Sequence, residues 1–336
     1  MFQNKPDWVV DEWTYGQYMA GQNDTMAEIV AHWESWFQYA ELENIASVGL
    51  NTVRIPIGWA YSHLQQAVQW AQSLNLKSGL RGTRQWFANQ TNIDRTLAAL
   101  QNLTSEFTQS KYASTVLTIE LVNEPFPYSA AELDILKSFY YDGYSTVRSH
   151  QNEQSILVVA LDEAFVGLTT WTDFMTEPNY HNVALDTHIY SMFDLDLLAM
   201  GYTDNLKWYC SQESSLVAVD QGMWTIVGEF TPANTDCALW LNGRGTGARY
   251  DNTLNSSAKL QFPGDCSGKS GADPSVFTAE YIDHLARSFE YQTYVYEKAS
   301  GWLMWTWKAE QAADWSMQEM ITYGWIPTPI TAKPHG

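Results

Sequence analysis

Two glutamates that directly follow short apolar segments are the strongest candidates for chemistry in this sequence. The segment TVLTIELV is followed by Asn123 and Glu124, and the segment WTIVG is followed by Glu229. If both segments are parallel strands, the two carboxylates lie at the carboxyl edge of the sheet, where such folds carry their active sites. Two carboxylates facing one another are the minimum for glycoside hydrolysis, one as proton donor and one as nucleophile or base. The alternative interpretation is that each is a solvated glutamate at a strand end.

Other predicted strand ends carry further polar and aromatic side chains. Arg54 lies in NTVRIPIG, His188 and Tyr190 lie in DTHIY, and Trp305 and Trp307 lie in GWLMWTW. An arginine beside a carboxylate keeps it ionised, as a nucleophile requires. The two tryptophans share one face of their predicted strand, so at least one should line the mouth of the site. The alternatives are that the histidine is structural and that both tryptophans fill the interior.

The composition excludes some partners and favours another. Lys and Arg total 18 against 38 Asp and Glu, which gives a net charge of −20. This charge repels phosphate backbones and anionic membranes, so we do not expect nucleic acid as a partner. The 16 Trp, 19 Tyr and 13 Phe provide surplus ring surface, which suits an uncharged sugar that packs its C–H face on rings. The alternative is an aromatic core.

Membrane spans, metals and cofactors are not predicted. The longest apolar segment, SILVVAL, is far shorter than the roughly 18 residues that a membrane span needs. The 7 histidines are scattered, and no Cys/His cluster has the spacing of metal ligands. Cys210, Cys237 and Cys266 allow one disulfide and leave one thiol.

An extracellular location is expected from weaker signals. No secretory leader is recognisable at the start of the sequence. The acidic pI of about 4.5 suits an extracellular protein. Acceptor sequons for N-glycosylation occur at Asn23, Asn89, Asn102 and Asn255.

Short apolar segments alternate with longer amphipathic ones along the chain. The predicted strands are 51–57, 115–122, 155–161, 183–188, 224–229 and 301–307. The predicted helices are 40–48, 63–76, 92–109, 132–150, 205–222 and 279–296. This alternation is typical of parallel strands joined by crossover helices. No glycine-rich dinucleotide turn occurs early, so we predict an α/β fold of the TIM-type (β/α)8 barrel class.

The predicted barrel is a single domain over residues 1–336, but it is incomplete. No Pro- or Ser-rich linker divides the chain. A barrel needs about eight strands, and two are not found in the sequence. Nothing strand-like precedes the first predicted helix, and residue 76 runs into SGLRGTRQWF without the expected third strand.

Long motifs resemble those of fungal exo-β-1,3-glucanases of glycoside hydrolase family 5. They are NTVRIPIG, LVNEP, DTHIYSMF, VGEF, TDCALWLNGRGTGARYD and GWLMWTWKAEQAADW. The resemblance runs from about residue 7 to residue 327 and implies a (β/α)8 barrel. It also implies a retaining hydrolase that releases glucose from the non-reducing ends of β-1,3-glucan in cell-wall metabolism. We expect a monomer that is secreted or located in the cell wall and needs no cofactor.

The resemblance implies a role for each matching residue. Glu124 is similar to the acid/base residue and Glu229 to the nucleophile, and retention requires their carboxyl groups to lie about 5 to 5.5 Å apart. The implied substrate-binding residues are Asn123 at the sugar 2-hydroxyl, Arg54 and Tyr190 beside the nucleophile, and His188 and Trp305 in subsites, with Trp305 as the stacking platform. Trp307, on the same strand face as Trp305, is expected to bind substrate as well. A disulfide between Cys237 and Cys266 is implied, whereas the family partner of Cys210 has no counterpart in the ending TAKPHG.

The sequence also departs from the family pattern. Members begin with a strand resembling RGVNLGGW, which we expect to be truncated here at the N-terminus. A third strand with its DLHG-type motif and loop is expected to be deleted near residues 76–78. Flanking elements plug the gaps in one interpretation, and the chain is then an active exohydrolase. In the other it is a catalytically impaired glucan-binding protein or an incomplete gene product. Endo action, β-1,4 or β-1,6 linkages and transglycosylation stay open.

Overall fold

The computed structural model describes most of the chain, including both catalytic candidates. The described residues are 2–10, 12–22, 27–57, 77–81, 86–87, 89–151 and 155–335. The helix predicted over residues 63–76 lies outside these ranges.

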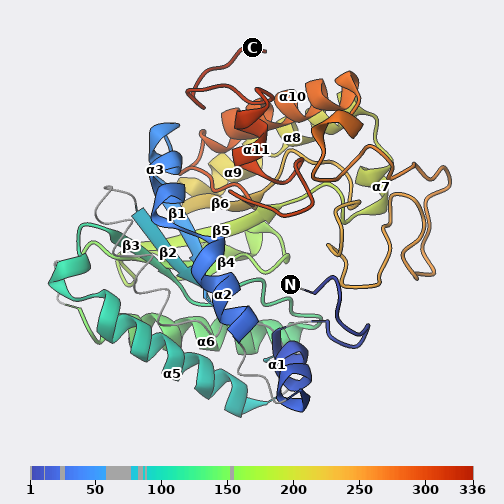
Figure 1. Cartoon of the computed structure of the whole chain (residues 1–336). Helices are drawn as coiled ribbons and strands as arrows, with labels where there is room; N and C mark the ends of the chain where they lie inside the picture. The colour runs from blue at the N-terminus through green and yellow to red at the C-terminus, as the bar shows by residue number, and fades with distance from the viewer. Residues whose placement is uncertain are drawn as a thin grey trace.

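A curled parallel sheet forms the centre of the fold (Figure 1). Its strands are β1 (Thr52–Pro56), β2 (Lys77–Arg81), β3 (Val116–Glu120), β4 (Val158–Asp162), β5 (Val183–Ile189) and β6 (Trp224–Phe230). They follow one another in sequence order, and every neighbouring pair is parallel. The carboxyl ends of all the strands therefore meet at one edge, which is the geometry the two glutamates require.

The prediction that the third strand is missing is wrong, because β2 occupies that position. The deletion of its DLHG-type motif and loop stays a prediction. β2 pairs with β1 from Thr52 opposite Lys77 to Pro56 opposite Arg81, and with β3 on its other side. The segment KSGLR has a single apolar residue, Leu80, and no β-branched or aromatic residue, so it gives little signal of a strand. It is a strand because its backbone pairs with that of β1 on one side and that of β3 on the other. The sequence still has no histidine between Lys77 and Phe87.

The predicted last strand, 301–307, is reduced to a short stretch beside β6. Trp302 forms a single parallel bridge with Val227, and Trp305 N–H donates to Phe230 O at 2.8 Å. Beyond that point the backbone leaves the sheet, because Thr306 exchanges hydrogen bonds with Trp315 and Met317 instead. Within the described residues no strand precedes β1, so the eight-stranded closure is not reached there. The observed fold is an α/β half-barrel.

Helices cover the sheet on both sides (Figure 1). The helices are α1 (Glu12–Gly21), α2 (Ala27–Trp36), α3 (Tyr39–Ser47), α5 (Gln90–Phe107), α6 (Ala130–Arg148), α7 (Leu195–Leu198), α8 (Tyr202–Ser211), α9 (Glu213–Asp220), α10 (Ala279–Tyr296) and α11 (Met317–Thr322). The prediction for 279–296 is confirmed, and the helix predicted over 205–222 is divided at Gln212. None of the described helices combines the length and apolar character that a bilayer span requires.

Side-chain caps set the start of the long helices. Asn89 accepts a hydrogen bond from Thr91 N–H, and Ser129 accepts one from Glu132 N–H. Thr278 does the same for Tyr281 N–H at the start of α10. Each cap satisfies a backbone donor that the helix itself leaves unpaired.

The sheet and its helices bury two large apolar clusters. One lies between the central strands and α5 and α6, and includes Phe107, Phe139 and Trp171. The other joins β6 to α8 and α10. Within it, the buried ring of Phe230, directly after Glu229, contacts Phe289 of α10 at 6.5 Å between centroids.

Between β6 and α10 the chain forms a long loop closed by a disulfide between Cys237 and Cys266. These are the two cysteines that the resemblance paired. Asp236, next to the bond, accepts hydrogen bonds from the backbone N–H groups of Arg249 and Tyr250. Cys210 is free and exposed.

Removal of the Phe289 ring should destabilise the fold. Phe289 is 1% exposed and contacts both Phe230 and Trp302. We expect Phe289→Ala to lower the free energy of unfolding by about 3–5 kcal/mol, because it leaves a cavity. Chemical denaturation measures this. Tyr294→Ala, on the exposed face of the same helix, is the control and should change it by about 0.5 kcal/mol or less. Equal effects of the two substitutions would contradict this packing.

Candidate active site

The two predicted glutamates meet at the carboxyl edge of the sheet. Glu229 lies in β6 with a side chain 10% exposed, whereas the Glu124 side chain, just beyond β3, is 37% exposed. A carboxylate oxygen of each lies within 4.8 Å of the other and of a nitrogen of His188. One glutamate is therefore enclosed by protein, and the other is open to solvent.

Arg54 reaches from β1 across the interior to the far side of the curl. Its Nη1 donates to Gly228 O at 2.7 Å and lies 3.5 Å from Glu229 Oε1. Its Nη2 lies 2.5 Å from Glu120 Oε2 and 3.0 Å from Asp186 Oδ2. Burial lowers the pKa of Arg54, but the charges of Asp186, Glu120 and Glu229 more than offset this and raise it above its ordinary value. Arg54 is thus a permanent cation beside Glu229, as predicted.

His188, at the end of β5, connects the two glutamates. Its Nδ1 lies 2.7 Å from Glu124 Oε1 and 3.5 Å from Glu229 Oε2. Burial lowers its pKa, but the hydrogen bond and charge of Asp186, together with Glu124, raise it to about 10. Arg54 Nη1 lies 3.0 Å from Nε2, a contact that becomes a hydrogen bond when the ring is neutral, since a guanidinium only donates. In both states Nδ1 carries the proton and donates it to Glu124.

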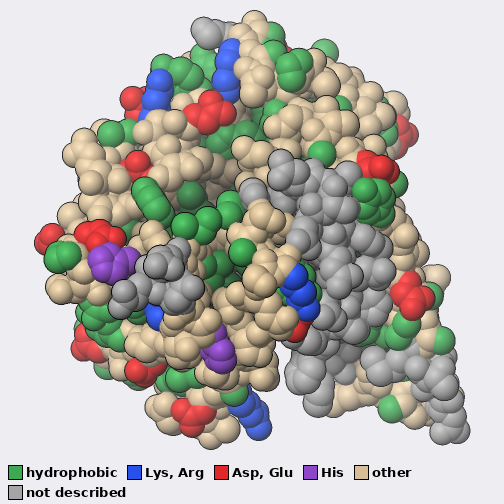
Figure 2. Space-filling view, turned by 90° about the vertical axis from the view of Figure 1, so that its left-hand side faces the viewer, with side chains coloured by type: hydrophobic (Ala, Val, Ile, Leu, Met, Phe, Trp, Pro, Cys, Tyr) green, Lys and Arg blue, Asp and Glu red, His purple; other side chains and the backbone are tan. Residues whose placement is uncertain are grey.

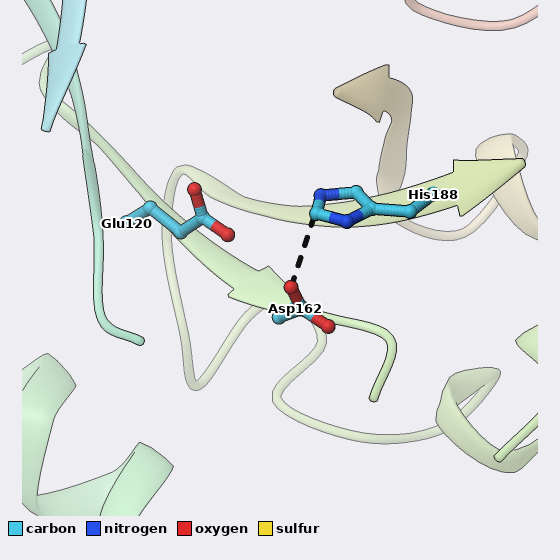
Figure 3. Close-up of side chains that lie close together, drawn as sticks. All are labelled: Glu120, Asp162 and His188. Carbon is cyan, nitrogen blue, oxygen red and sulfur yellow. Dashed lines mark ion pairs between the residues drawn. The ribbon is translucent and has the colours of Figure 1, made fainter. Parts of the chain in front are cut away.

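Three buried carboxylates around this pair were missed by the sequence reasoning. They are Glu120 in β3, Asp162 in β4 and Asp186 in β5. Figure 3 shows Glu120, Asp162 and His188 directed into the same space from neighbouring strands. Each acid occurs inside an apolar strand sequence, where a charged residue is rare unless it is paired. That contrast was the available signal.

Asp162 fixes the backbone of Glu124. Its Oδ2 accepts from Glu124 N–H at 2.8 Å, and its Oδ1 accepts from Ala164 N–H at 2.7 Å. Glu124 has φ +44°, a left-handed conformation that costs energy for a residue with a side chain. The buried carboxylate of one strand therefore holds the strained loop after its neighbour.

Glycine is the one residue type that fits at position 228, directly before Glu229. Its N–H donates to Asp186 Oδ1 at 2.8 Å. A Cβ at this position would collide with the Asp186 carboxylate. The close approach places Asp186 where it also binds Arg54.

The other predicted binding residues take different places. Tyr190 donates its hydroxyl to Glu229 Oε2 at 3.0 Å. Asn123 Oδ1 is buried, with no hydrogen-bond partner in the part of the chain that the structure describes. Trp305 is 37% exposed. Trp307 donates a hydrogen bond from its indole N–H to Glu41 of α3 at 2.9 Å. Its polar group is therefore used in a contact between two parts of the fold.

An apolar cavity of about 730 Å³ opens between α2, β1 and the Trp302–Trp307 segment. It occupies the gap in the curl, between the edge strand and the segment beside β6. Its lining includes Trp33, Phe37 and Trp305, and it reaches Arg54. Figure 2 shows one face of the molecule, which is hollowed near its centre, with hydrophobic side chains in the hollow.

Two sets of side chains have a geometry that could hold a cation. They are Glu124, His188 and Glu229, and Glu120, Asp162 and His188. In both sets carboxylates already pair with Arg54 or His188, so a metal ion would have to displace these cations. The expectation that the protein needs no metal or cofactor stays a prediction.

Comparisons with known proteins agree on one family. Residues 19–242 match the family described as Cellulase (glycosyl hydrolase family 5). The chain is 35% identical over 359 residues to the probable glucan 1,3-beta-glucosidase A of Aspergillus niger, which covers 97% of this chain and 83% of that protein. It is 31% identical over 361 residues to glucan 1,3-beta-glucosidase I/II of Saccharomyces cerevisiae, with 97% and 79% covered.

Solved structures bear on the fold alone. A broad specificity endoglucanase from Clostridium acetobutylicum superposes with a TM-score of 0.60 at 13% identity, covering 88% of this chain and 90% of that one. The endo-beta-1,4-glucanase B of Bacillus halodurans gives 0.57 at 14% identity, with 80% and 51% covered. The structural neighbours are TIM barrels, and this chain shares their curled parallel sheet.

Arg54 should contribute to stability far more than an exposed arginine. Its removal leaves Glu120 and Asp186 buried without their cation, so we expect Arg54→Met to lower the free energy of unfolding by about 3–5 kcal/mol. Arg287, which pairs with Asp283 in solvent, is the matched control, and Arg287→Met should cost at most about 1 kcal/mol. Denaturation curves of both variants test this, and a small effect at Arg54 would show that the network is not coupled to folding.

The raised pKa of His188 makes stability depend on pH. The protonated ring stabilises the folded state fully below its ordinary pKa of 6.5, and this contribution is lost as the pH rises through about 10. We expect the difference in unfolding free energy between wild type and His188→Gln to shrink between pH 7 and pH 10. Denaturation at several pH values measures this difference. The contributions of lysines and tyrosines to the pH dependence cancel in it, because both proteins contain the same ones. A difference that stays constant over this range would contradict the assignment.

Proposed function

Because the chain belongs to glycosyl hydrolase family 5, we propose that it is a retaining glycosidase that removes glucose from the non-reducing ends of β-1,3-glucan. The observation that carries the proposal is the proximity of the Glu124 and Glu229 carboxylates, with oxygens within 4.8 Å. Retaining enzymes hold their carboxyl groups about 5–5.5 Å apart, whereas inverting enzymes need about 6.5–9.5 Å to admit a water molecule. The short separation supports retention.

Glu229 is the nucleophile in this proposal. Arg54 and the Tyr190 hydroxyl both lie against its carboxylate, as a cation and a hydrogen-bond donor that orient it. One oxygen attacks the anomeric carbon, the glycosidic C–O bond breaks, and a glycosyl ester to Glu229 forms. Its enclosure keeps this carboxylate from being solvated by bulk water.

Glu124 is the acid/base residue. It gives its proton to the oxygen of the leaving sugar as the glycosidic bond breaks. Its exposed side chain then takes a proton from water, whose oxygen attacks the anomeric carbon and releases glucose and the free Glu229 carboxylate. His188, donating from Nδ1 to Oε1 of Glu124, holds the carboxyl group in position through both steps.

The substrate and linkage are proposed from the relatives, which bear the name glucan 1,3-beta-glucosidase. Trp305, which is 37% exposed and lines the cavity, supplies a ring on which a glucosyl residue can stack. Asn123 Oδ1 supplies an acceptor for a sugar hydroxyl.

We also propose that the protein acts outside the cell. Disulfides persist in oxidising compartments, and Cys237 and Cys266 form one. The sequon asparagines Asn89, Asn102 and Asn255 are exposed, whereas Asn23 lies outside the described residues.

Glucose release from laminarin at mildly acidic pH tests the function. We expect Glu229→Gln to lower kcat by about 10⁴-fold or more, because it removes the nucleophile. Glu124→Gln should slow natural oligosaccharides strongly and activated aryl glucosides much less, since a good leaving group needs no proton. NMR of the first product should show β-glucose, as retention requires.

Exo action has its own readout. Laminarin whose reducing ends have been reduced with borohydride should still release glucose. Oligosaccharides longer than glucose should not accumulate. Normal rates in Glu229→Gln would make the nucleophile assignment wrong. A folded wild-type protein that binds laminarin but releases nothing would favour the glucan-binding alternative.

A further inference from the structure

A buried turn at residues 313–315 packs against the tyrosine that contacts the nucleophile. Ala313, Asp314 and Trp315 are 0%, 0% and 4% exposed. The Trp315 ring is stacked on the Tyr190 ring, with 6.0 Å between the centroids and an angle of 26° between the planes. The Tyr190 hydroxyl in turn donates to Glu229 Oε2 at 3.0 Å. One aromatic ring therefore separates this turn from the carboxylate that attacks the sugar.

The side chain of Asp314 attaches the turn to two other parts of the fold. Its Oδ1 accepts a hydrogen bond from Ser270 Oγ at 2.7 Å, in the segment that precedes α10. Its Oδ2 accepts one from the Tyr281 hydroxyl at 3.1 Å, in the first turn of α10. Beside it, Ala313 N–H donates to Gly271 O at 2.8 Å. One carboxyl group thus joins the turn to α10 and to the segment before it.

Trp315 takes its position from this turn. Its indole N–H has no hydrogen-bond partner among the residues that the structure describes. Its backbone N–H donates to Ala312 O at 3.0 Å, and its carbonyl oxygen accepts from Thr306 N–H at 3.0 Å. The ring is therefore placed by its backbone and by packing. Asp314 is the neighbouring residue whose side chain ties that backbone to α10.

The carboxyl group of Asp314 is held by hydroxyls and not by a cation. Within the described residues no cation pairs with it. Burial and the charge of Glu319 in α11 raise its pKa to about 7, although the hydroxyls of Ser270 and Tyr281 lower it. At mildly acidic pH it is therefore mostly a neutral acid, with one oxygen that accepts and one that donates. A buried polar group costs free energy unless it is hydrogen-bonded, so this position requires both partners.

We propose that Asp314 is a positioning residue that holds the Trp315 ring against Tyr190. In this way it keeps the Tyr190 hydroxyl on the Glu229 carboxylate. The inference rests on the proposed function and adds to it a residue that acts on the nucleophile through two others. Small displacements of a reacting group lower rates steeply, even when the change that causes them lies far from the chemistry.

Hydrolysis of an aryl β-glucoside with a dinitrophenolate leaving group tests this assignment. The leaving group departs without a proton, so kcat/KM on this substrate reports attack by Glu229. We expect Asp314→Ala to lower kcat/KM by about 5- to 50-fold, because a displaced Tyr190 no longer orients the nucleophile. Asp314→Asn resembles the neutral acid, with one acceptor and one donor, and should stay within about threefold of wild type.

A double-mutant cycle separates positioning through Tyr190 from a general structural role. Tyr190→Phe should lower kcat/KM by about 10- to 100-fold, the effect of losing a hydrogen bond to a charged group. Adding Asp314→Ala to Tyr190→Phe should change this rate by about twofold or less, because the hydroxyl that Asp314 positions is already absent. If Asp314 acts independently of Tyr190, the two fold-changes multiply instead.

Glu290 provides the matched control for burial. It is a buried acid of the same helix, and its carboxylate accepts from His335 N–H. Glu290→Ala should destabilise the protein but leave kcat/KM of the folded protein unchanged. If Asp314→Ala does not fold, Ser270→Ala/Tyr281→Phe removes both hydroxyl partners instead and should show the same dependence on Tyr190.

Fold-changes that multiply in the cycle, or an unchanged kcat/KM in folded Asp314→Ala, would overturn the positioning role while leaving the proposed function intact. A wild-type protein that hydrolyses neither the aryl glucoside nor laminarin would overturn the proposed function and this role with it.

Discussion

The guanidinium of Arg54 is the interaction on which the rest of the site depends. It lies inside the curl, 8% exposed, and pairs with carboxylates from β3, β5 and β6. Buried charges are costly unless they are paired and hydrogen-bonded. This requirement restricts the sheet to a register in which Arg54 faces inward and Glu120, Asp186 and Glu229 converge on it. The network that orients Glu229 is therefore the one that fixes the strands relative to each other.

The two glutamates differ in their environment, although both carboxylates lie at the carboxyl edge of the sheet. Glu229 has a cation, a tyrosine hydroxyl and little solvent, whereas Glu124 has the imidazole of His188 and an open side. Two carboxyl groups that share one site acquire distinct roles in this way. Asp162 supports the Glu124 side, since one carboxylate accepts hydrogen bonds from the backbone N–H groups of Glu124 and of Ala164 in the next loop.

At the open side of the curled sheet, side chains rather than a strand connect the two ends of the sheet. Glu41 of α3 accepts from Trp307, Lys308 and Gln318, so the segment beside β6 is tied to the helix that precedes β1. Burial raises the pKa of Glu41, but its hydrogen bonds to Trp307 and Lys308 more than offset this effect. The net pKa is therefore below the ordinary value. The charged form thus joins the two ends of the curl around the apolar cavity. An edge that would otherwise expose backbone groups is partly covered by α2 and α3.

Much of the fold could be predicted because apolar segments and turn residues act locally. The strands that became β1 and β3 to β6 were recognised from their apolar content, as was α10 from its periodicity. β2 was not, because KSGLR becomes a strand only through the backbone groups of its two neighbours. The buried acids were passed over for a related reason, since a carboxylate within an apolar run makes sense only once its cation from a distant strand is known.

The sequence by itself determined which residue types stand at the strand ends, and so placed Glu124 and Glu229 at one edge of a parallel sheet. Their separation, the solvent exposure of each, and the proton that His188 keeps on Nδ1 were decided by the tertiary structure alone. These properties depend on distances between β1, β3, β5 and β6, segments far apart in the chain, and electrostatic interactions follow distance and burial in space.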